Sequence, residues 1–137
     1  MKPEDRYDSL FQFYAQEHDI VPWQLLKAQV KAESSFDPMA RSTVGAVGLA
    51  QFMSGTFSEW STRLHIANPN PYNPEHSVNC QAGYMRWLLD NFQNNVDRAL
   101  GAYNFGVGNE MQNRPWPIET QNYVKRIKDY LADYVAL

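Results

Sequence analysis

The fold is decided by the segment Pro22–Ser35, which reads PWQLLKAQVKAESS. Its apolar residues Trp23, Leu26 and Val30 step by three and four positions, which is the spacing of one face of an α-helix. Because proline is favoured in a first turn, the sequence predicts a helix that begins at Pro22 and covers the segment. The next position on this apolar face is Glu33, so a carboxyl group stands where a hydrophobic side chain would be expected.

The residues after this helix predict a tight, irregular segment. Asp37 precedes Pro38, and a residue before proline is pushed out of the helical conformation, so the helix should end there. Residues 38–55 contain three glycines and the string VGAVG, which favours a loop or a small hairpin over a long helix. Glu33 is therefore expected one turn before the end of its helix and just ahead of a glycine-rich loop.

Helical spacing continues on both sides of this segment. Apolar periodicity, an N-cap signal at Asn73 and helix-breaking prolines predict five to seven helices in all. The further helices are expected around Tyr7–Tyr14, over Gly55–Leu64, from Asn73 through Leu88, around Val96–Tyr103 with Gly106 and Gly108 ending it, and around Tyr123–Tyr134. The sequence thus predicts a mainly α protein.

Composition limits the class of protein. The 137 residues suffice for one domain with a substantial core, and 44% hydrophobic residues exclude intrinsic disorder. No apolar run approaches the ~20 residues of a membrane span. A net charge of −3 without a basic cluster argues against a nucleic-acid partner. The single cysteine, Cys80, excludes an intrachain disulfide and is expected to be a small buried residue, and the three histidines fit no common zinc spacing.

Two glutamates are candidates for catalysis. Burial disfavours the charged form, so Glu33 should have a raised pKa, and a glutamate tuned to ~6–7 suits a general acid at neutral pH. Alternatively, Glu33 lies at the edge of its apolar face and reaches water. Glu119, four residues before Tyr123, would complete a two-carboxylate glycosidase site. It also lies in a predicted first helical turn, where a negative charge suits the helix dipole, and we favour this structural interpretation.

Two further strings carry polar groups that can face a ligand. Gly48-Leu49-Ala50-Gln51 offers the side-chain amide of Gln51 for hydrogen bonding. Ala102-Tyr103-Asn104-Phe105-Gly106 places Tyr103 on an apolar helix face, where its hydroxyl needs a partner when buried. The many aromatic residues, with four Trp, eight Tyr and seven Phe, indicate either an aromatic core or a cleft that stacks sugar rings.

Four strings in this order resemble the catalytic domain of the soluble lytic transglycosylases. They are Glu33-Ser34, Gly48-Leu49-Ala50-Gln51, Ala102-Tyr103-Asn104 and Glu119-Thr120-Gln121-Asn122-Tyr123-Val124. The resemblance runs from about Pro22 to Val135. It implies a lysozyme-like single domain over residues 1–137, with a central cleft and a short loop or hairpin after the catalytic helix. It also implies cleavage of the β-1,4 bond between N-acetylmuramic acid and N-acetylglucosamine in peptidoglycan, with no metal or organic cofactor.

The resemblance also implies roles for individual residues. Glu33 would be the single catalytic acid and base, and Ser34 would orient its carboxylate. Gln51 would contact the sugar beside the scissile bond. Tyr103 would hydrogen-bond near Glu33 and the developing oxocarbenium centre, and Asn104 would support the same wall.

The last string would supply the remaining contacts. Glu119 and Tyr123 would shape the cleft and its contacts with the glycan or the stem peptide. The chain departs from the family at Ala50, where methionine is usual, and at Phe105, where alanine is frequent. A methionine at position 50 would pack against a sugar ring, so these departures bear on glycan affinity and leave the proton-transfer groups intact.

Two alternatives compete with a transglycosylase. A goose-type lysozyme hydrolyses the bond and needs a second carboxylate to activate water. Pro38–Ser58 contains no acidic residue and Asp37 is the nearest candidate, so attack by the substrate's own C6 hydroxyl, giving a 1,6-anhydro end, is the simpler course. A non-catalytic wall-binding module is disfavoured because Glu33, Gln51 and Tyr103 are all present.

The expected partner is the peptidoglycan glycan strand, and we expect a monomer. The first residues, Met1–Arg6, lead into no apolar stretch, so no signal peptide is expected in this sequence; either the protein is not exported by that route or a leader has been removed. Since the substrate lies outside the cytoplasm, the sequence favours a phage-encoded lysin or delivery by a secretion machine. Net negative charge gives no attraction to an anionic wall, so aromatic contacts and hydrogen bonds must supply the affinity.

Overall fold

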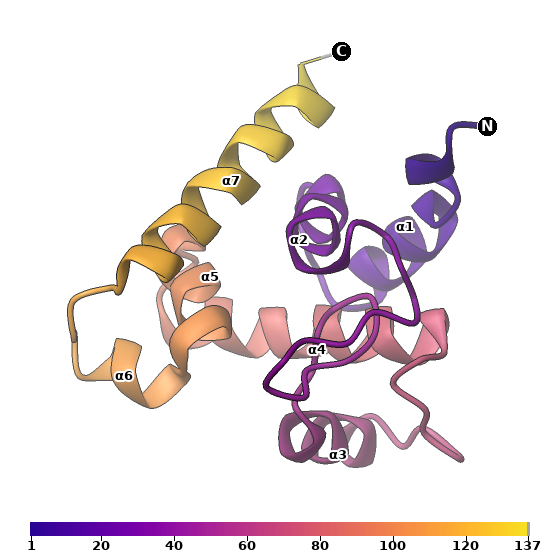
Figure 1. Cartoon of the computed structure of the whole chain (residues 1–137), viewed down its shortest axis with the longest axis horizontal. Coiled ribbons are helices and arrows are strands. Elements are labelled where there is room, and N and C mark those ends of the chain that lie inside the picture. The colour runs from indigo at the N-terminus through magenta and orange to yellow at the C-terminus, as the bar shows by residue number, and fades with distance from the viewer. Residues whose placement is uncertain (137) are drawn as a thin grey trace.

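The computed structural model describes residues 1–136, which are mainly helical with almost no strand, and this confirms the predicted mainly α class (Figure 1). No helix in this part of the chain is both long and apolar enough to cross a membrane. That residues 1–137 form a single domain stays a prediction, and Leu137 lies outside the described residues. The elements are η1 (Pro3–Asp5), α1 (Asp8–Glu17), α2 (Gln24–Ser34), α3 (Ser54–Arg63), α4 (Pro74–Asn91), α5 (Val96–Phe105), α6 (Val107–Met111) and α7 (Ile118–Val135).

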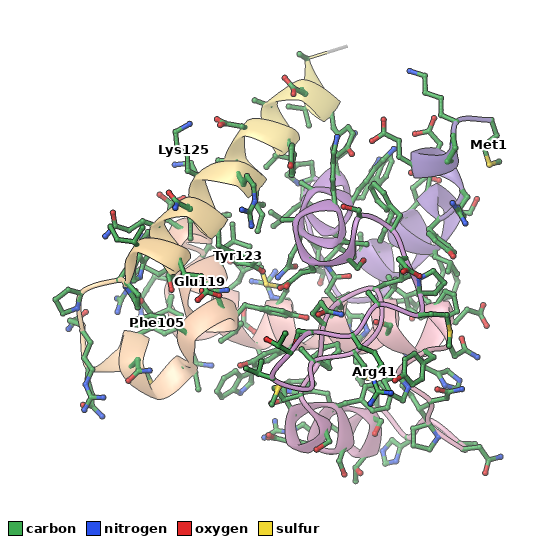
Figure 2. All side chains as sticks on the ribbon, viewed as in Figure 1. Met1, Arg41, Phe105, Glu119, Tyr123 and Lys125 are labelled. Atoms are coloured by element: carbon green, nitrogen blue, oxygen red, sulfur yellow. The ribbon has the colours of Figure 1, made fainter. Side chains whose placement is uncertain are left out.

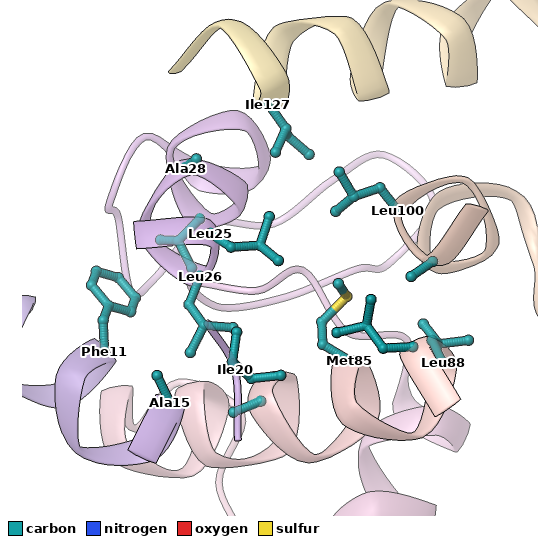
Figure 3. Packing of buried hydrophobic residues seen from close by; sticks show 14 of the residues in the cluster. Phe11, Ala15, Ile20, Leu25, Leu26, Ala28, Met85, Leu88, Leu100 and Ile127 are labelled. Carbon is teal, nitrogen blue, oxygen red and sulfur yellow. The ribbon is translucent and has the colours of Figure 1, made fainter. Parts of the chain in front are cut away.

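Helix α2 lies among the other helices, between α1 and α7 and above the long helix α4 (Figure 1). It packs against all three neighbours, so its middle is fully buried. The close-up in Figure 3 shows side chains from α1, α2, α4, α5 and α7 packed together in the core. The buried residues labelled there include Leu25, Leu26, Met85, Leu88, Leu100 and Ile127. This packing holds the C-terminal end of α2, which carries Glu33, in a fixed place.

A hairpin-like segment, residues 40–52, follows α2. Isolated antiparallel bridges pair Arg41 with Val47 and Val47 with Phe52, and residues 1–136 contain no longer strand. Gly48 has a φ of +82°, and a β-carbon built there would overlap the carbonyl oxygen of Pro71. Only glycine fits this close approach, which fixes the hairpin against the loop before α4. The predicted loop or small hairpin is therefore present.

Two predicted helix boundaries are wrong. Helix α2 begins at Gln24, because Pro22 and Trp23 form a preceding turn with hydrogen bonds from Leu25 N to Pro22 O and from Leu26 N to Trp23 O. Gly106 ends α5 as predicted, but Gly108 lies within the short helix α6.

The predicted N-cap of α4 is correct. Oδ1 of Asn73 accepts hydrogen bonds from the backbone N–H groups of Glu75 and His76. These bonds satisfy two of the amide groups that a helix leaves free at its start. The loop before α4 therefore ends at a fixed point beside the hairpin.

A second, smaller core joins the hairpin to α3, α4 and α5. Its buried members are Ala50, Phe52, Phe57, Trp60 and Cys80. Burial raises the pKa of the Cys80 thiol to about 12, so this side chain is a small buried residue, as predicted, rather than a reactive thiolate. The abundant aromatic residues thus build a core, and part of this core backs the candidate site.

Candidate active site

A cavity of about 240 Å³ lies where the C-terminal end of α2 meets the hairpin, α5 and α7. Five of the seven predicted site residues line it, together with Ser42, Val44, Ala46 and Met53. The five are Glu33, Gln51, Tyr103, Asn104 and Glu119. Within residues 1–136, no group of three His, Cys, Asp or Glu side chains is arranged to hold a metal ion. The fold therefore brings together residues that are up to 86 positions apart in the sequence.

Glu33 is the most strongly perturbed acid at this cavity. Burial of its carboxyl group raises its pKa to about 8, and the negative charge of Glu119 adds to this rise. A hydrogen bond from Tyr123 and the positive charge of Arg126 act in the opposite direction but do not overcome burial. At neutral pH Glu33 is therefore mostly protonated and faces a solvent-accessible cavity, which is the state that a general acid needs.

Tyr123 has a role that differs from the predicted one. It is only 3% exposed and does not line the cavity; instead its hydroxyl donates a hydrogen bond of 2.7 Å to Oε2 of Glu33. Figure 2 shows Tyr123 and Glu119 on the side of α7 that faces α2 and α5, whereas Lys125 points away. Burial raises the pKa of Tyr123 well above its ordinary value, so the hydroxyl remains a proton donor in this bond.

Ser34 does not hold the carboxylate, which corrects the expectation for this residue. Its hydroxyl donates to the carbonyl oxygen of Leu49 at 2.8 Å and also lies 3.3 Å from the carbonyl oxygen of Val30. Successive residues of a helix point about 100° apart, so Ser34 faces the hairpin while Glu33 faces the cavity. Ser34 thus attaches the hairpin to the end of α2.

Tyr103 and Ala50 are joined by a hydrogen bond in the wall of the cavity. The Tyr103 hydroxyl donates to the carbonyl oxygen of Ala50 at 2.9 Å, and no hydrogen bond joins it to Glu33 among the described residues. Ala50 itself is fully buried and lines neither this cavity nor its neighbour. The expectation that position 50 contacts a sugar ring is therefore wrong: its side chain belongs to the second core.

The two amide side chains of the site each have one end fixed. Nε2 of Gln51 donates to the carbonyl oxygens of Ala40 and Gly48, so its Oε1 remains for a ligand. Oδ1 of Asn104 accepts from the hydroxyl of buried Thr120 at 2.7 Å, so its Nδ2 remains as a donor. The cavity therefore offers one fixed acceptor and one fixed donor to a bound molecule.

Glu119 has the location that each of its two interpretations requires, and its catalytic role stays a prediction. It lies in the first turn of α7, where its charge suits the helix dipole, and it also lines the cavity with Glu33. A second cavity of about 210 Å³ shares Gln51, Met53, Tyr103 and Asn104 with the first and extends toward Tyr84. The site is therefore a groove that continues past Tyr103 rather than a closed pocket.

The sequence-based prediction missed Gln29 and Gln81, two fully buried residues behind the site. Nε2 of Gln29 donates to the Tyr123 hydroxyl at 3.1 Å, and Nε2 of Gln81 donates to Oε1 of Gln29 at 2.9 Å. A signal existed for one of them: Gln29 lies four residues before Glu33, on the buried side of α2. A polar side chain at a buried helical position needs a partner, and here that partner touches Glu33.

Comparison with known proteins agrees with this geometry. Residues 10–121 match the model of the family described as "Transglycosylase SLT domain". The chain is 30% identical over 148 residues to the soluble lytic murein transglycosylase of Escherichia coli strain K12, covering 93% of this chain and 23% of that protein. It is 34% identical over 107 residues to peptidoglycan transglycosylase gp16 of Escherichia phage T7, covering 77% of this chain and 8% of that protein.

Solved structures give the same result. An inactive mutant of lytic transglycosylase Slt from Pseudomonas aeruginosa matches with a TM-score of 0.85 at 26% identity, over 95% of this chain and 24% of that one. The 70 kDa soluble lytic transglycosylase of Escherichia coli matches with a TM-score of 0.81 at 29% identity, again over 95% and 24%. The chain thus spans about a quarter or less of the length of these relatives. With the family model matching most of the chain and the lysozyme-like helical fold shared, the chain belongs to the transglycosylase SLT domain family.

Proposed function

We propose that this chain is a peptidoglycan lytic transglycosylase, which cleaves the β-1,4 bond between N-acetylmuramic acid and N-acetylglucosamine. The observation that carries the proposal is the state of Glu33. Its carboxyl group lines a groove, has a pKa raised to about 8 by burial, and accepts a 2.7 Å hydrogen bond from Tyr123. A carboxyl group that is protonated at neutral pH and open to a ligand can donate its proton to a leaving oxygen.

The reaction needs one acid and base in two steps. In the first step, Glu33 gives its proton to the glycosidic oxygen, the bond from C1 to that oxygen breaks, and the electron pair leaves with the oxygen. The substrate's own N-acetyl group stabilises the positive charge at C1. In the second step, the C6 hydroxyl attacks C1 and its proton returns to Glu33, which restores the acid and leaves a 1,6-anhydro ring. No water is consumed.

The groove supplies groups that suit a glycan. The free Oε1 of Gln51 can accept from a sugar hydroxyl, and the free Nδ2 of Asn104 can donate to a hydroxyl or an N-acetyl oxygen. The half-exposed Met53 lies between the two adjoining cavities, where its thioether can pack against a sugar face. Glu119 remains beside these groups and can accept a further hydroxyl or a stem-peptide amide.

Hydrolysis is the second candidate, and Glu119 is the observation that favours it. Because Glu119 lines the same cavity as Glu33, it could activate a water molecule in place of the C6 hydroxyl. Its carboxylate would then act as the general base. The product would carry a reducing end rather than an anhydro ring.

Mass spectrometry of soluble products from purified sacculi distinguishes these activities. We expect anhydro-muropeptides from the wild type, and the two kinds of product differ by the mass of one water molecule. If muropeptides with reducing ends are the main product, the protein is a lysozyme and not a transglycosylase. If no muropeptides are released but the protein still sediments with the sacculi, it is a non-catalytic wall-binding module.

The context of the reaction belongs to the same proposal. The partner is the glycan strand of the cell wall, which lies outside the cytoplasm, and the protein works as a monomer with no cofactor. The T7 relative is named a peptidoglycan transglycosylase, and a phage-borne or secretion-associated enzyme would meet the wall in a comparable way.

A further inference from the structure

A continuous chain of hydrogen bonds runs from the centre of the protein to Glu33. Gln81 of α4 donates to Gln29 of α2 at 2.9 Å, Gln29 donates to Tyr123 of α7 at 3.1 Å, and Tyr123 donates to Glu33 at 2.7 Å. Both glutamines are fully buried and Tyr123 is nearly so. We propose that Gln29 and Gln81 are positioning residues that fix the direction of the Tyr123 hydroxyl and thereby place the acid proton of Glu33 on Oε1.

The donor-to-acceptor direction of this series of hydrogen bonds is set at Gln81, its buried end. Nε2 of Gln81 also donates to the backbone carbonyl oxygen of Leu26 at 3.1 Å. A carbonyl oxygen can only accept, so the amide of Gln81 must present its nitrogen to both Leu26 and Gln29. Oε1 of Gln29 is therefore the acceptor, which turns the nitrogen of Gln29 toward Tyr123.

The same logic fixes the outer end. The hydroxyl oxygen of Tyr123 receives a hydrogen from Gln29, so its own hydrogen is directed toward Oε2 of Glu33. An oxygen that accepts this hydrogen does not also hold the acid proton in that direction. In a protonated carboxyl group the carbonyl oxygen is also the stronger acceptor, so a hydrogen bond accepted at Oε2 places the acid proton of Glu33 on Oε1. On the proposed function, on which this step rests, that is the oxygen left to protonate the glycosidic bond.

Stability does not explain why these amides are in the core. Oε1 of Gln81 is buried and has no hydrogen-bond partner among residues 1–136. A buried polar atom without a partner is costly, and two leucines of similar volume would avoid that cost. We therefore expect replacement of both glutamines by leucine to keep or raise the melting temperature while activity falls, which a merely structural role would not produce.

The hydrogen bonds that link Gln81, Gln29 and Tyr123 to Glu33, which we call the relay, should also affect the pKa of Glu33. Hydrogen bonds in series polarise one another, so the bond from Gln29 strengthens Tyr123 as a donor to the carboxylate. The ionisable groups that face Glu33 are Tyr123, Arg126 and Glu119 from α7 and Tyr103 from α5. All four are unchanged when Gln29 is replaced. A rise in the pKa of Glu33 in such a variant would therefore report the loss of the relay.

The test is a double-mutant cycle on Gln29 and Tyr123. The ¹³C NMR titration of the Glu33 side chain, assigned by the signal missing in Glu33→Gln, gives its pKa without any turnover. Turnover of purified sacculi gives kcat and KM. For Gln29→Leu we expect a higher Glu33 pKa and a kcat about three- to tenfold lower with little change in KM, the size expected for one neutral hydrogen bond.

The cycle separates a relay from two independent effects. Tyr123→Phe should shift both readouts further, and adding Gln29→Leu to it should change neither, because the relay is already broken. Gln81→Leu should act in the same direction as Gln29→Leu but more weakly. The matched control is Gln121→Leu, which removes an amide from the exposed face of α7 and should leave both readouts unchanged.

Each outcome is decisive. A Glu33 pKa and kcat that stay at wild-type values in Gln29→Leu, or effects that add to those of Tyr123→Phe, would overturn the proposal. If Gln29→Leu does not fold, the double variant Gln29→Leu/Gln81→Leu, which leaves no orphaned amide, takes its place in the cycle. If the wild type itself releases no product but the pKa pattern holds, the proposed function fails and the relay stands.

Discussion

Helix α2 carries a buried ionisable side chain near each end, and the protein stabilises opposite protonation states of the two. Near its start, Lys27 is 4% exposed, and its ammonium group lies 2.6 Å from Oδ1 of Asp5 and 2.9 Å from Oδ1 of Asp8. Near its end, the carboxyl group of Glu33 has a neutral tyrosine hydroxyl as its hydrogen-bond donor. Lys27 is held as an ion, and Glu33 is held as a neutral acid.

The pKa shifts follow from this difference in partners. Burial lowers the pKa of Lys27, but its hydrogen bonds to Asp5 and Asp8 outweigh burial and the net shift is upward. For Glu33 burial dominates, and the Tyr123 bond only reduces the rise. Cavity size does not identify the functional end. A cavity of about 420 Å³ beside Lys27 is larger than the one at Glu33, yet Lys27 in its wall is already paired with Asp5 and Asp8. The reactive end is the one without a counter-ion in contact.

The largest expected effect is on turnover in Glu33→Gln. Glutamine keeps the shape of the side chain but cannot transfer a proton, and general acid–base catalysis contributes about 10²–10⁴-fold. Because one group serves both steps, we expect a loss of at least about 10³–10⁴-fold in anhydro-muropeptide release from sacculi, with glycan binding retained.

Glu119→Gln is the matched control for that measurement. It removes the other carboxylate of the cavity and should reduce turnover by less than about tenfold, in line with the loss of one hydrogen bond. A greater loss of turnover from Glu119→Gln than from Glu33→Gln would show that Glu119 of α7, and not Glu33, is the catalytic acid. Near-normal turnover by Glu33→Gln would end the proposed mechanism.

The same substitution should change how stability depends on pH. The pKa of Glu33 rises from 4.5 to about 8 on folding, so the folded state binds a proton that the unfolded state releases in this window. Wild-type stability therefore falls as pH rises from about 4.5 to 8. Glu33→Gln lacks this loss, so its advantage in free energy of unfolding should be near zero at pH 4 and reach up to a few kcal/mol above pH 8.

Urea unfolding of both proteins at several pH values measures this difference. Glu119→Gln again serves as the control, because it removes a negative charge from the same cavity without removing the buried acid. A stability difference between wild type and Glu33→Gln that stays flat across pH 4–9 would show that the carboxyl group is not buried in solution.

Much of this site could be predicted from the sequence, for a simple reason. The position of Glu33 on an apolar helix face, the hairpin after it and the gathering of Gln51, Tyr103 and Asn104 with it follow from local periodicity and from family resemblance. The side-chain directions could not be predicted. Ser34, Tyr123 and Ala50 were all expected at the site. Their side chains instead contact the hairpin, Glu33 and the second core respectively.

The ion-pair partners of Lys27 also could not be predicted from the sequence. Nothing local to α2 indicates that Asp5 and Asp8, about twenty residues earlier, fold back onto it. Gln29 and Gln81 are 52 positions apart, and their contact depends on how α2 and α4 cross. Local pattern decides which face of a helix is buried, whereas the partner of a buried polar group is set by tertiary packing.

Removing the cation near the start of α2 should lower the free energy of unfolding without changing catalysis. Lys27→Met keeps most of the packing of the side chain but removes the cation from Asp8, which is only partly exposed. We expect a loss of about 1–2 kcal/mol in free energy of unfolding, allowing for solvent screening, and unchanged turnover per folded molecule.

The pH dependence of this loss should be opposite to that of Glu33. The hydrogen bond from Lys27 lowers the pKa of Asp5, and Lys27→Met removes this effect. Contributions from such acids are present above their ordinary pKa values and are lost as pH falls through the lowered ones. The gap between wild type and Lys27→Met should therefore narrow below about pH 4 in urea titrations. A gap that widens there would contradict the ion-pair account.

The smallest expected effect is that of Lys31→Met, one turn after Lys27 on the same side of α2. The Lys31 ammonium lies 3.5 Å from Oε2 of Glu4 and 4.6 Å from the centre of the Tyr130 ring, but about a third of the side chain is exposed. Exposed pairs contribute about 0.2–1 kcal/mol, so the loss should lie in that range and shrink with added salt. Thermal melts at low and high salt measure it beside Lys27→Met. If Lys31→Met lowers the free energy of unfolding as much as Lys27→Met does, then the number of charges, and not their burial, determines stability at this end of α2. The comparison with the buried Glu33 would then have no physical basis.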